Sequence, residues 1–211
     1  MQEKLSIKEN IIKFDRSSLE KNIWEIIDAR FKNWEFKIDS SLDDLHDPYF
    51  LKDMDKAVER IKKAKELNQR IIIFGDYDVD GVTSTSILMH LFKKLWMQAS
   101  YRLPHREKDG YGLKSYFIDE LAELSVDLII TVDCWTRDLE VIKYAKQKWI
   151  DVIVTDHHSV PDVIPKEAIA IVNPKRKDCD YIYKDLSWAW VAFKLIQALA
   201  YEFMEEKEAL E

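Results

Sequence analysis

The hydrophobic pattern of the chain changes its period near residue 68. Before that point, residues 17–33 and 50–68 carry apolar side chains at the spacing of an amphipathic helix. After it come short apolar runs rich in β-branched residues, which are typical of strands buried on both faces of a parallel sheet. The runs cover residues 70–75, 126–132, 151–155 and 168–172, and helical spacing alternates with them at 82–95, 114–124, 138–148 and 187–204.

This alternation predicts the fold class α/β, with a doubly wound, mostly parallel sheet flanked by helices. We expect two parts, which are an N-terminal helical preface over residues 1–67 and an α/β domain over residues 68–211. The chain of 211 residues is long enough for both.

Composition narrows the class of protein. Hydrophobic residues make up 47% and charged residues 34%, and no apolar stretch approaches the roughly 18 residues of a membrane span. The N-terminus lacks the pattern of a signal peptide, and two cysteines are too few for a disulfide scaffold, so we expect a cytoplasmic protein without a membrane partner. A net charge of -7 argues against a passive nucleic-acid coat but leaves room for an enzyme acting on nucleic acid.

Acidic and histidine side chains follow three of the expected strands. Because the carboxyl ends of parallel strands meet at one sheet edge, we expect these side chains to converge there. Carboxylates that converge without a neighbouring cation repel each other, so the cluster predicts metal binding. Oxygen and nitrogen ligands favour Mn²⁺ or Mg²⁺, and a pair of such ions can hydrolyse a phosphodiester. The residues are Asp76, Asp78 and Asp80 after the first strand, Asp133 after the second, and Asp156, His157 and His158 after the third.

Each fragment alone has a simpler interpretation. The Asp76–Gly81 segment resembles the start of a calcium loop, but it lacks the glutamate that closes such a loop and the helices that flank it. A lone aspartate after a strand is usually a helix cap, and a histidine pair is usually a surface or satisfied polar group. Only the combination favours a metal site.

The same fragments, in the same order, resemble the DHH phosphoesterase superfamily. The first motif is IIIFGDYDVDGVTSTSIL, the second LIITVDC and the third VIVTDHHSVP. The segments PHREKDGYGL and AIVNPKRKDCDYIYKDLS narrow the resemblance to the RecJ branch, over roughly residues 45–205.

This resemblance implies roles for individual residues. It makes Asp78, Asp80, Asp133 and His157 metal ligands, with Asp133 able to bridge two ions. It places His158 toward the scissile phosphate, and it makes Asp156 a group that positions the histidines. We expect Asp76 to be near the site and to support its loop. Candidate substrate contacts are Arg106, Tyr111, Asn173 and Lys175. The alternative for Arg106, Tyr111 and Asn173 is a structural role in their loops, and for Lys175 a solvated face.

The resemblance also implies an activity. We expect metal-dependent hydrolysis of single-stranded DNA from the 5′ end, in DNA repair and recombination. Two alternatives stay open, namely a phosphodiesterase for short oligonucleotides or cyclic dinucleotides, and a non-catalytic replication scaffold. Clustered acidic residues argue against the scaffold. Expected partners are single-stranded DNA and a single-strand-binding protein or a helicase. The oligomeric state is not predicted beyond a preference for a monomer.

The chain departs from the RecJ pattern in two ways. The family has a further metal-ligand motif and a second domain after the segment VAFKLIQAL, whereas residues 205–211 are a charged tail. We therefore expect a fragment, truncated on the C-terminal side of its DHH domain, with weak activity of its own.

The second departure concerns tryptophan. The chain has 4 glycines and 7 tryptophans, and typical usage would give about 15 glycines. Glycine stands in the RecJ pattern at six of the tryptophan positions, and only Trp24 stands where a large apolar residue fits the pattern. Some bacterial lineages read the UGA codon as glycine, and another code reads it as tryptophan. We therefore hypothesise six misread glycine codons. The positions are Trp34, Trp96, Trp135, Trp149, Trp188 and Trp190.

Overall fold

A computed structural model describes residues 4–7, 10–13, 44–110, 112–133 and 139–204. The chain forms two units, which divide between Leu45 and His46. In the N-terminal unit, β1 (Lys4–Ile7) and β2 (Asn10–Lys13) pair antiparallel. The start of the expected helical preface is therefore a strand pair. The helix expected over residues 17–33 lies outside the described residues.

The C-terminal unit is built on a five-stranded sheet in the order β4-β3-β5-β6-β7. Every pairing in it is parallel, which confirms the expected α/β class. Along the chain its elements are η3 (Pro48–Phe50), α2 (Met54–Glu66), β3 (Ile71–Phe74), α3 (Val79–Lys94), β4 (Ala99–Arg102), α4 (Ser115–Glu123), β5 (Leu128–Val132), α5 (Leu139–Gln147), β6 (Asp151–Thr155), β7 (Ala170–Val172) and α6 (Trp188–Phe203).

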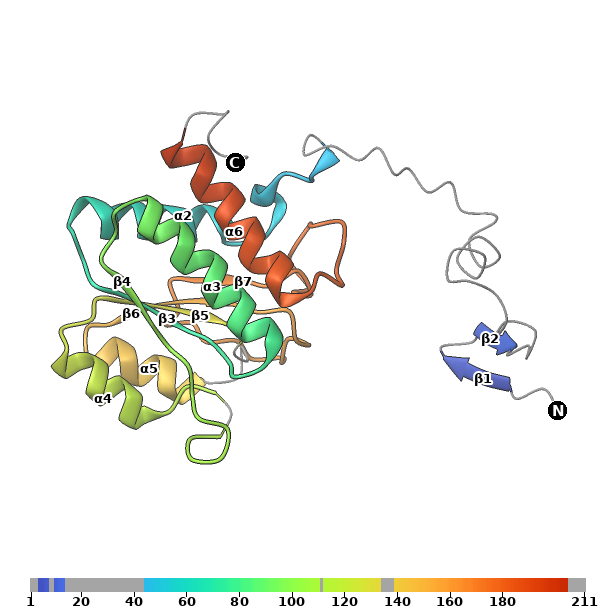
Figure 1. The fold of residues 1–211 in the computed structure, drawn as a ribbon, viewed down its shortest axis with the longest axis horizontal. Coiled ribbons are helices and arrows are strands. Elements are labelled where there is room, and N and C mark those ends of the chain that lie inside the picture. The colour runs from blue at the N-terminus through green and yellow to red at the C-terminus, as the bar shows by residue number, and fades with distance from the viewer. Residues whose placement is uncertain (1–3, 8–9, 14–43, 111, 134–138, 205–211) are drawn as a thin grey trace. The chain divides into compact units, whose positions relative to one another are not determined.

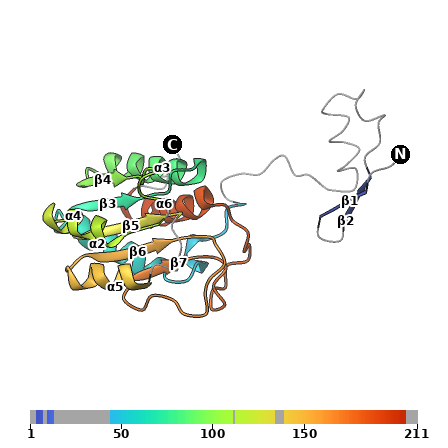
Figure 2. The same ribbon diagram turned by 90° about the horizontal axis from the view of Figure 1, so that it is seen from below.

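Helices cover both faces of the sheet, with α2, α3 and α6 on one face and α4 and α5 on the other (Figures 1 and 2). Alternate residues of each strand serve the two cores. Ile71 and Ile73 pack toward α2, α3 and α6, whereas Ile72 and Phe74 pack toward α4 and α5. Burial on both faces explains why the strands read as continuous apolar runs.

The strand order reverses direction once, beside β3. The chain runs from β3 outward to β4 and then returns to place β5 on the other side of β3. At such a switch point the two crossover connections leave the sheet on opposite faces, and a crevice opens at the carboxyl ends of the two central strands. The topology therefore marks the ends of β3 and β5 as the place for a ligand.

The boundary between the two units differs from the expected one. The prediction divided the chain between residues 67 and 68, but the compact unit begins at His46. The reason is α2, whose Met54, Ala57 and Ile61 are fully buried in the core on the sheet. An ion pair between Arg60 and Asp151 of β6 (Nε–Oδ2, 2.7 Å) also ties α2 to the sheet.

Four helices end in the same backbone motif, in which the residue after the cap is left-handed. After α2, α3, α4 and α5, respectively, these residues are Asn68, Trp96, Ser125 and Trp149, with φ of 52°, 55°, 55° and 64°. In each case the next residue donates its N–H back into the last helical turn, as in a Schellman motif. Glycine is the usual residue at this position. The two indoles are almost entirely exposed, at 92% for Trp96 and 90% for Trp149.

The last helix, α6, lies against α3 (Figure 1). Its first turn carries Trp188 and Trp190. Two indoles in the first turn therefore do not displace this helix from its place beside α3 and the sheet. Trp190 is 47% exposed and contacts Phe193, while Trp188 faces the sheet edge. In the part of the chain that the structure describes, neither α6 nor any other helix is long and apolar enough to cross a membrane.

Candidate metal centre

The loop after β3 brings two carboxylates to the switch point. Asp76 is buried, and Asp78 caps α3 by accepting a hydrogen bond from the Gly81 N–H (Oδ1–N, 2.9 Å). The turn is tight, because a Cβ at position 81 would lie 2.5 Å from the backbone oxygen of Asp76. Glycine is therefore required at position 81 for the close approach of the helix to the loop.

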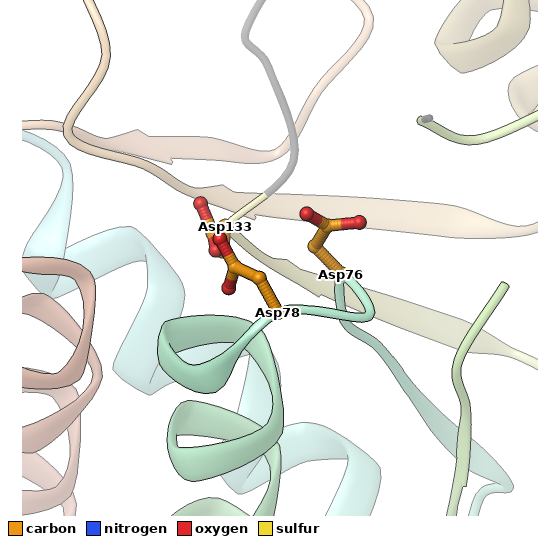
Figure 3. A group of neighbouring side chains, drawn as sticks. All are labelled: Asp76, Asp78 and Asp133. Carbon is orange, nitrogen blue, oxygen red and sulfur yellow. The ribbon is translucent and has the colours of Figure 1, made fainter. Parts of the chain in front are cut away.

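Asp133 reaches the same point from the end of β5. Its backbone is left-handed (φ 58°), a conformation that aspartate tolerates better than most residues and that often marks a functional site. Oxygen atoms of Asp76, Asp78 and Asp133 lie within 4.8 Å of one another (Figure 3). The three carboxylates thus converge as the strand order predicts, although they come from positions almost 60 residues apart along the chain.

The electrostatics of this cluster favour a bound cation. Burial, together with the nearby Asp78 and Asp76 carboxylates, raises the pKa of Asp133 from 3.8 to about 9. Burial also raises the pKa of Asp76. Within the described residues, the buried Oδ1 of Asp76 has no hydrogen-bond partner. A divalent cation would remove the repulsion and would satisfy this oxygen, so the residues fit a hard metal ion.

The third group of polar residues follows β6, the neighbour of β5. Asp156 is fully buried, and its Oδ1 accepts hydrogen bonds from the backbone N–H groups of His157 (2.7 Å) and His158 (3.0 Å). The same oxygen lies 2.8 Å from Nδ1 of His158. One carboxylate therefore holds the histidine turn and orients one of its rings, which is the geometry expected of a positioning group.

Both histidine rings use Nδ1 for a hydrogen bond within the protein, and Nε2 is the remaining ring nitrogen of each. Nδ1 of His157 lies 2.5 Å from the carbonyl oxygen of Leu186, which can only accept, so Nδ1 carries the proton. Burial lowers the pKa of His157 and favours the neutral ring. Donation from Nδ1 leaves Nε2 with a lone pair, the form in which histidine binds metals.

Trp188 covers one side of this histidine pair. The centroid of its indole lies 3.6 Å from that of His157 and 4.8 Å from that of His158. Its Nε1 is buried and has no hydrogen-bond partner within the described residues. The indole therefore takes up space beside the rings without satisfying its own polar atom.

The group of carboxylates that the structure brings together differs from the predicted set of carboxylate ligands at one position. Asp78 and Asp133 are in the carboxylate group, and Asp76, expected only to support the loop, is its third member. Asp80 lies in the first turn of α3 and is not part of this group.

The predicted substrate contacts lie in different settings. Arg106 is exposed and stacks over the ring of Tyr77 at 4.5 Å, whereas Tyr111 lies outside the described residues. Lys175 is partly exposed and pairs with Asp185 (Nζ–Oδ1, 3.7 Å). Asn173 is fully buried, where it donates to the backbone oxygen of His158 (3.1 Å) and accepts from the N–H of Lys175 (2.9 Å).

Comparison with known proteins places the chain in a family. Residues 70–211 match the family model described as "DHH family, N-terminal domain". The chain belongs to the DHH family. Among curated DHH proteins, it is 42% identical over 163 residues to the single-stranded-DNA-specific exonuclease RecJ of Bacillus subtilis, a match covering 77% of this chain and 21% of that protein. It is 39% identical over 150 residues to the RecJ of Escherichia coli, covering 71% and 26%.

A solved structure shows the same likeness. The crystal structure of an exonuclease RecJ bound to manganese superposes with a TM-score of 0.66 at 32% identity, covering 72% of this chain and 38% of the other. The RecJ of Thermus thermophilus in complex with Mn²⁺ gives 0.61 at 29% identity, covering 72% and 21%. This DHH chain thus spans between about a fifth and two fifths of these proteins.

Proposed function

We propose that this chain is the metal-binding part of a RecJ-like exonuclease, which hydrolyses single-stranded DNA from its 5′ end with Mn²⁺ or Mg²⁺. We place it in DNA repair and recombination in the cytoplasm. The observation that carries the proposal is the convergence of Asp76, Asp78 and Asp133 at the switch point of the sheet. Similarity to relatives named as single-stranded-DNA-specific exonucleases supports the substrate class.

The chain's own residues divide into ligands and supports. In our proposal Asp76, Asp78 and Asp133 hold a divalent ion, and the Nε2 atoms of the histidine pair face the same edge as further ligands or phosphate contacts. Asp80 remains a candidate ligand for a second ion. When bound, the metal supplies positive charge for the phosphodiester and acidifies a water molecule.

The supports act through hydrogen bonds. Asp156 fixes the ring of His158, and the Leu186 carbonyl fixes the protonation of His157. Asn173 holds the histidine turn from the end of β7. We propose that Arg106 and Lys175 contact phosphates of the strand.

The test begins with metal binding by the chain itself. Calorimetric titration with Mn²⁺ should show binding to the wild type, and Asp133→Asn should weaken it at least tenfold. Asp162→Asn is a matched control, because this aspartate is 92% exposed and pairs only with Lys177 within the described residues. Binding that survives Asp133→Asn unchanged would refute the ligand assignment.

Hydrolysis is then measured with protein in excess, so that weak activity is detected. The substrates are single-stranded DNA labelled at either end, the matching duplex, and a dinucleotide. Release of nucleotides from the 5′ end of the single strand, with Mn²⁺ and not in Asp133→Asn, is the expected result. Cleavage of the dinucleotide in preference to the longer strand would favour the phosphodiesterase alternative.

A further inference from the structure

We propose that Tyr77 is a positioning residue, which holds the guanidinium of Arg106 beside the carboxylate cluster as a clamp for a substrate phosphate. This inference rests on the proposed function, since it names a phosphate of the bound strand as the ligand. It starts from a contact that joins two separate segments, the loop after β3 and the loop before α4.

Tyr77 stands between two of the clustered carboxylates in the sequence and is only half-buried. Its neighbours Asp76 and Asp78 turn toward Asp133, while its ring lies 4.5 Å from the guanidinium carbon of Arg106 (Cζ to ring centroid). A guanidinium over an aromatic face is attracted to it through its charge, and this contact is not a hydrogen bond to a side-chain oxygen. The contact therefore holds the charge without using up its hydrogen bonds.

Arg106 differs in this respect from the other arginines that the structure describes. Within those residues its guanidinium makes no ion pair and no hydrogen bond, and it lies over the Tyr77 ring. The others all donate or pair, as Arg60 does to Asp151, Arg70 to the Leu124 carbonyl, Arg102 to Glu120, and Arg176 to Asp53 and Asp178. Beside a proposed metal site, the N–H groups of such a guanidinium can donate two parallel hydrogen bonds to two oxygens of one phosphate.

The loop that carries Arg106 is closed by its own hydrogen bonds. The carboxylate of Asp109 accepts from the His105 N–H (Oδ2–N, 2.6 Å) and from the Tyr116 hydroxyl of α4 (2.9 Å). Residues 105 and 109 thus fasten both ends of the short turn in which Arg106 lies. With its backbone held there, the remaining freedom of Arg106 is in its side chain, which the Tyr77 ring restrains.

The position of this guanidinium also explains why the ring is needed. Arg106 lies over the ring of Tyr77, the residue between the clustered Asp76 and Asp78 in the sequence. An unrestrained arginine could turn onto the carboxylates and compete with a metal ion for them. Stacking on Tyr77 keeps the charge near the cluster, where it meets the anionic strand, and away from a direct ion pair.

The experiment measures binding of a phosphorothioate oligothymidylate, which resists hydrolysis, by fluorescence anisotropy of the 211-residue chain with Mn²⁺. We expect Arg106→Ala to raise the Kd about tenfold. It should also reduce the slope of log Kd against log salt concentration by about one, because one phosphate contact is lost. Tyr77→Leu should raise the Kd about fivefold, and Tyr77→Phe, which keeps the aromatic face, should stay within about twofold of the wild type. In the Arg106→Ala background, Tyr77→Leu should have no further effect.

Two controls separate positioning from structural damage. Mn²⁺ binding should be unchanged in both Tyr77 variants, and Arg70→Ala, which removes the same charge at the opposite end of β3, should leave the Kd unchanged. Equal losses from Tyr77→Leu with and without Arg106 would overturn the inference and leave the proposed function standing. A wild-type chain that binds Mn²⁺ but no single strand would overturn both.

Discussion

Replacing Trp96 and Trp149 with glycine should stabilise this protein. Both residues follow a helix in the left-handed conformation, with φ of 55° and 64°. An L-residue in this region costs about 1–2 kcal/mol, because its Cβ crowds the following carbonyl oxygen. Glycine has no such penalty, but its greater conformational freedom stabilises the unfolded chain by about 0.4–1 kcal/mol. The net gain is therefore roughly 0.5–1 kcal/mol at each position.

The indoles themselves offer little to offset this gain. With 92% and 90% of their surface exposed, they bury almost no apolar area that the substitution would return to water. For the double variant we expect about 1–2 kcal/mol, which for a domain of this size corresponds to a rise in Tm of about 2–8 °C. Thermal unfolding followed by circular dichroism, in EDTA, measures it.

Alanine gives the decisive comparison. Trp96→Ala and Trp149→Ala remove the indoles but keep a Cβ in the left-handed backbone, so they should bring little or none of the gain. Trp190→Gly should have the opposite sign, because this residue lies within the helical turn of α6 and glycine there costs about 0.5–1 kcal/mol. If alanine stabilises as much as glycine, the conformational explanation is refuted.

The gene offers a separate check on the hypothesis of misread codons. We expect TGA at positions 34, 96, 135, 149, 188 and 190, and TGG at position 24. TGG at the six positions would end that hypothesis, while the stability prediction would stand. Trp34 and Trp135 lie outside the described residues, and the first-turn backbone of α6 at Trp188 and Trp190 is not left-handed.

Three further predictions concern the carboxylate site. Asp133→Asn should raise the Tm in EDTA, because it replaces a buried carboxyl that must take up a proton on folding by a neutral amide. It should also abolish the rise in Tm that Mn²⁺ produces in the wild type; a retained Mn²⁺ shift contradicts this. The pKa of Asp133 is about 9 in the folded protein and 3.8 ordinarily, so the metal-free protein should lose stability as the pH rises from about 4 to about 9. The affinity for Mn²⁺ should increase over the same range, because the metal binds the deprotonated carboxylate. Calorimetric titrations in buffers of different ionisation enthalpy measure this affinity, and an affinity independent of pH would contradict the prediction. Asp156→Asn should keep the fold but lower nucleotide release about 10–100-fold by loosening His158, whereas unchanged release would remove its positioning role.

The sequence predicts the sheet well where both faces of a strand are buried. The segments that contain β3, β5, β6 and β7 are short, continuous apolar runs, which are easily identified as buried strands. β4 was not predicted, because its residues Ala99–Arg102 are largely exposed at the edge of the sheet and show no apolar run. The unit boundary was misplaced because helical spacing alone does not say which core a helix joins.

The site was predictable as a location more than as a list of ligands. The rule that polar residues after parallel strands share one edge predicted that Asp78 and Asp133 converge, as the structure shows, and the role of the histidine pair stays a prediction. It could not rank Asp76 against Asp80, since the choice depends on how the Gly81 turn points each carboxylate. The contact between Tyr77 and Arg106 joins two loops, and nothing in the local pattern of either loop indicates it.

The switch-point topology also bears on how this protein folds. The three carboxylates meet only when β3 and β5 have paired across the intervening β4 excursion, and the histidines join them only when β6 has added to β5. Such non-local pairings pay their loop-closure entropy before they gain any contact, which slows folding. During synthesis, residues 76 and 78 are therefore made about 50 residues before the strand that completes the carboxylate group. A metal ion that binds all three carboxylates would stabilise only the sheet in which β3 and β5 are paired. Metal binding at the three carboxylates would therefore indicate that the sheet of this domain has formed.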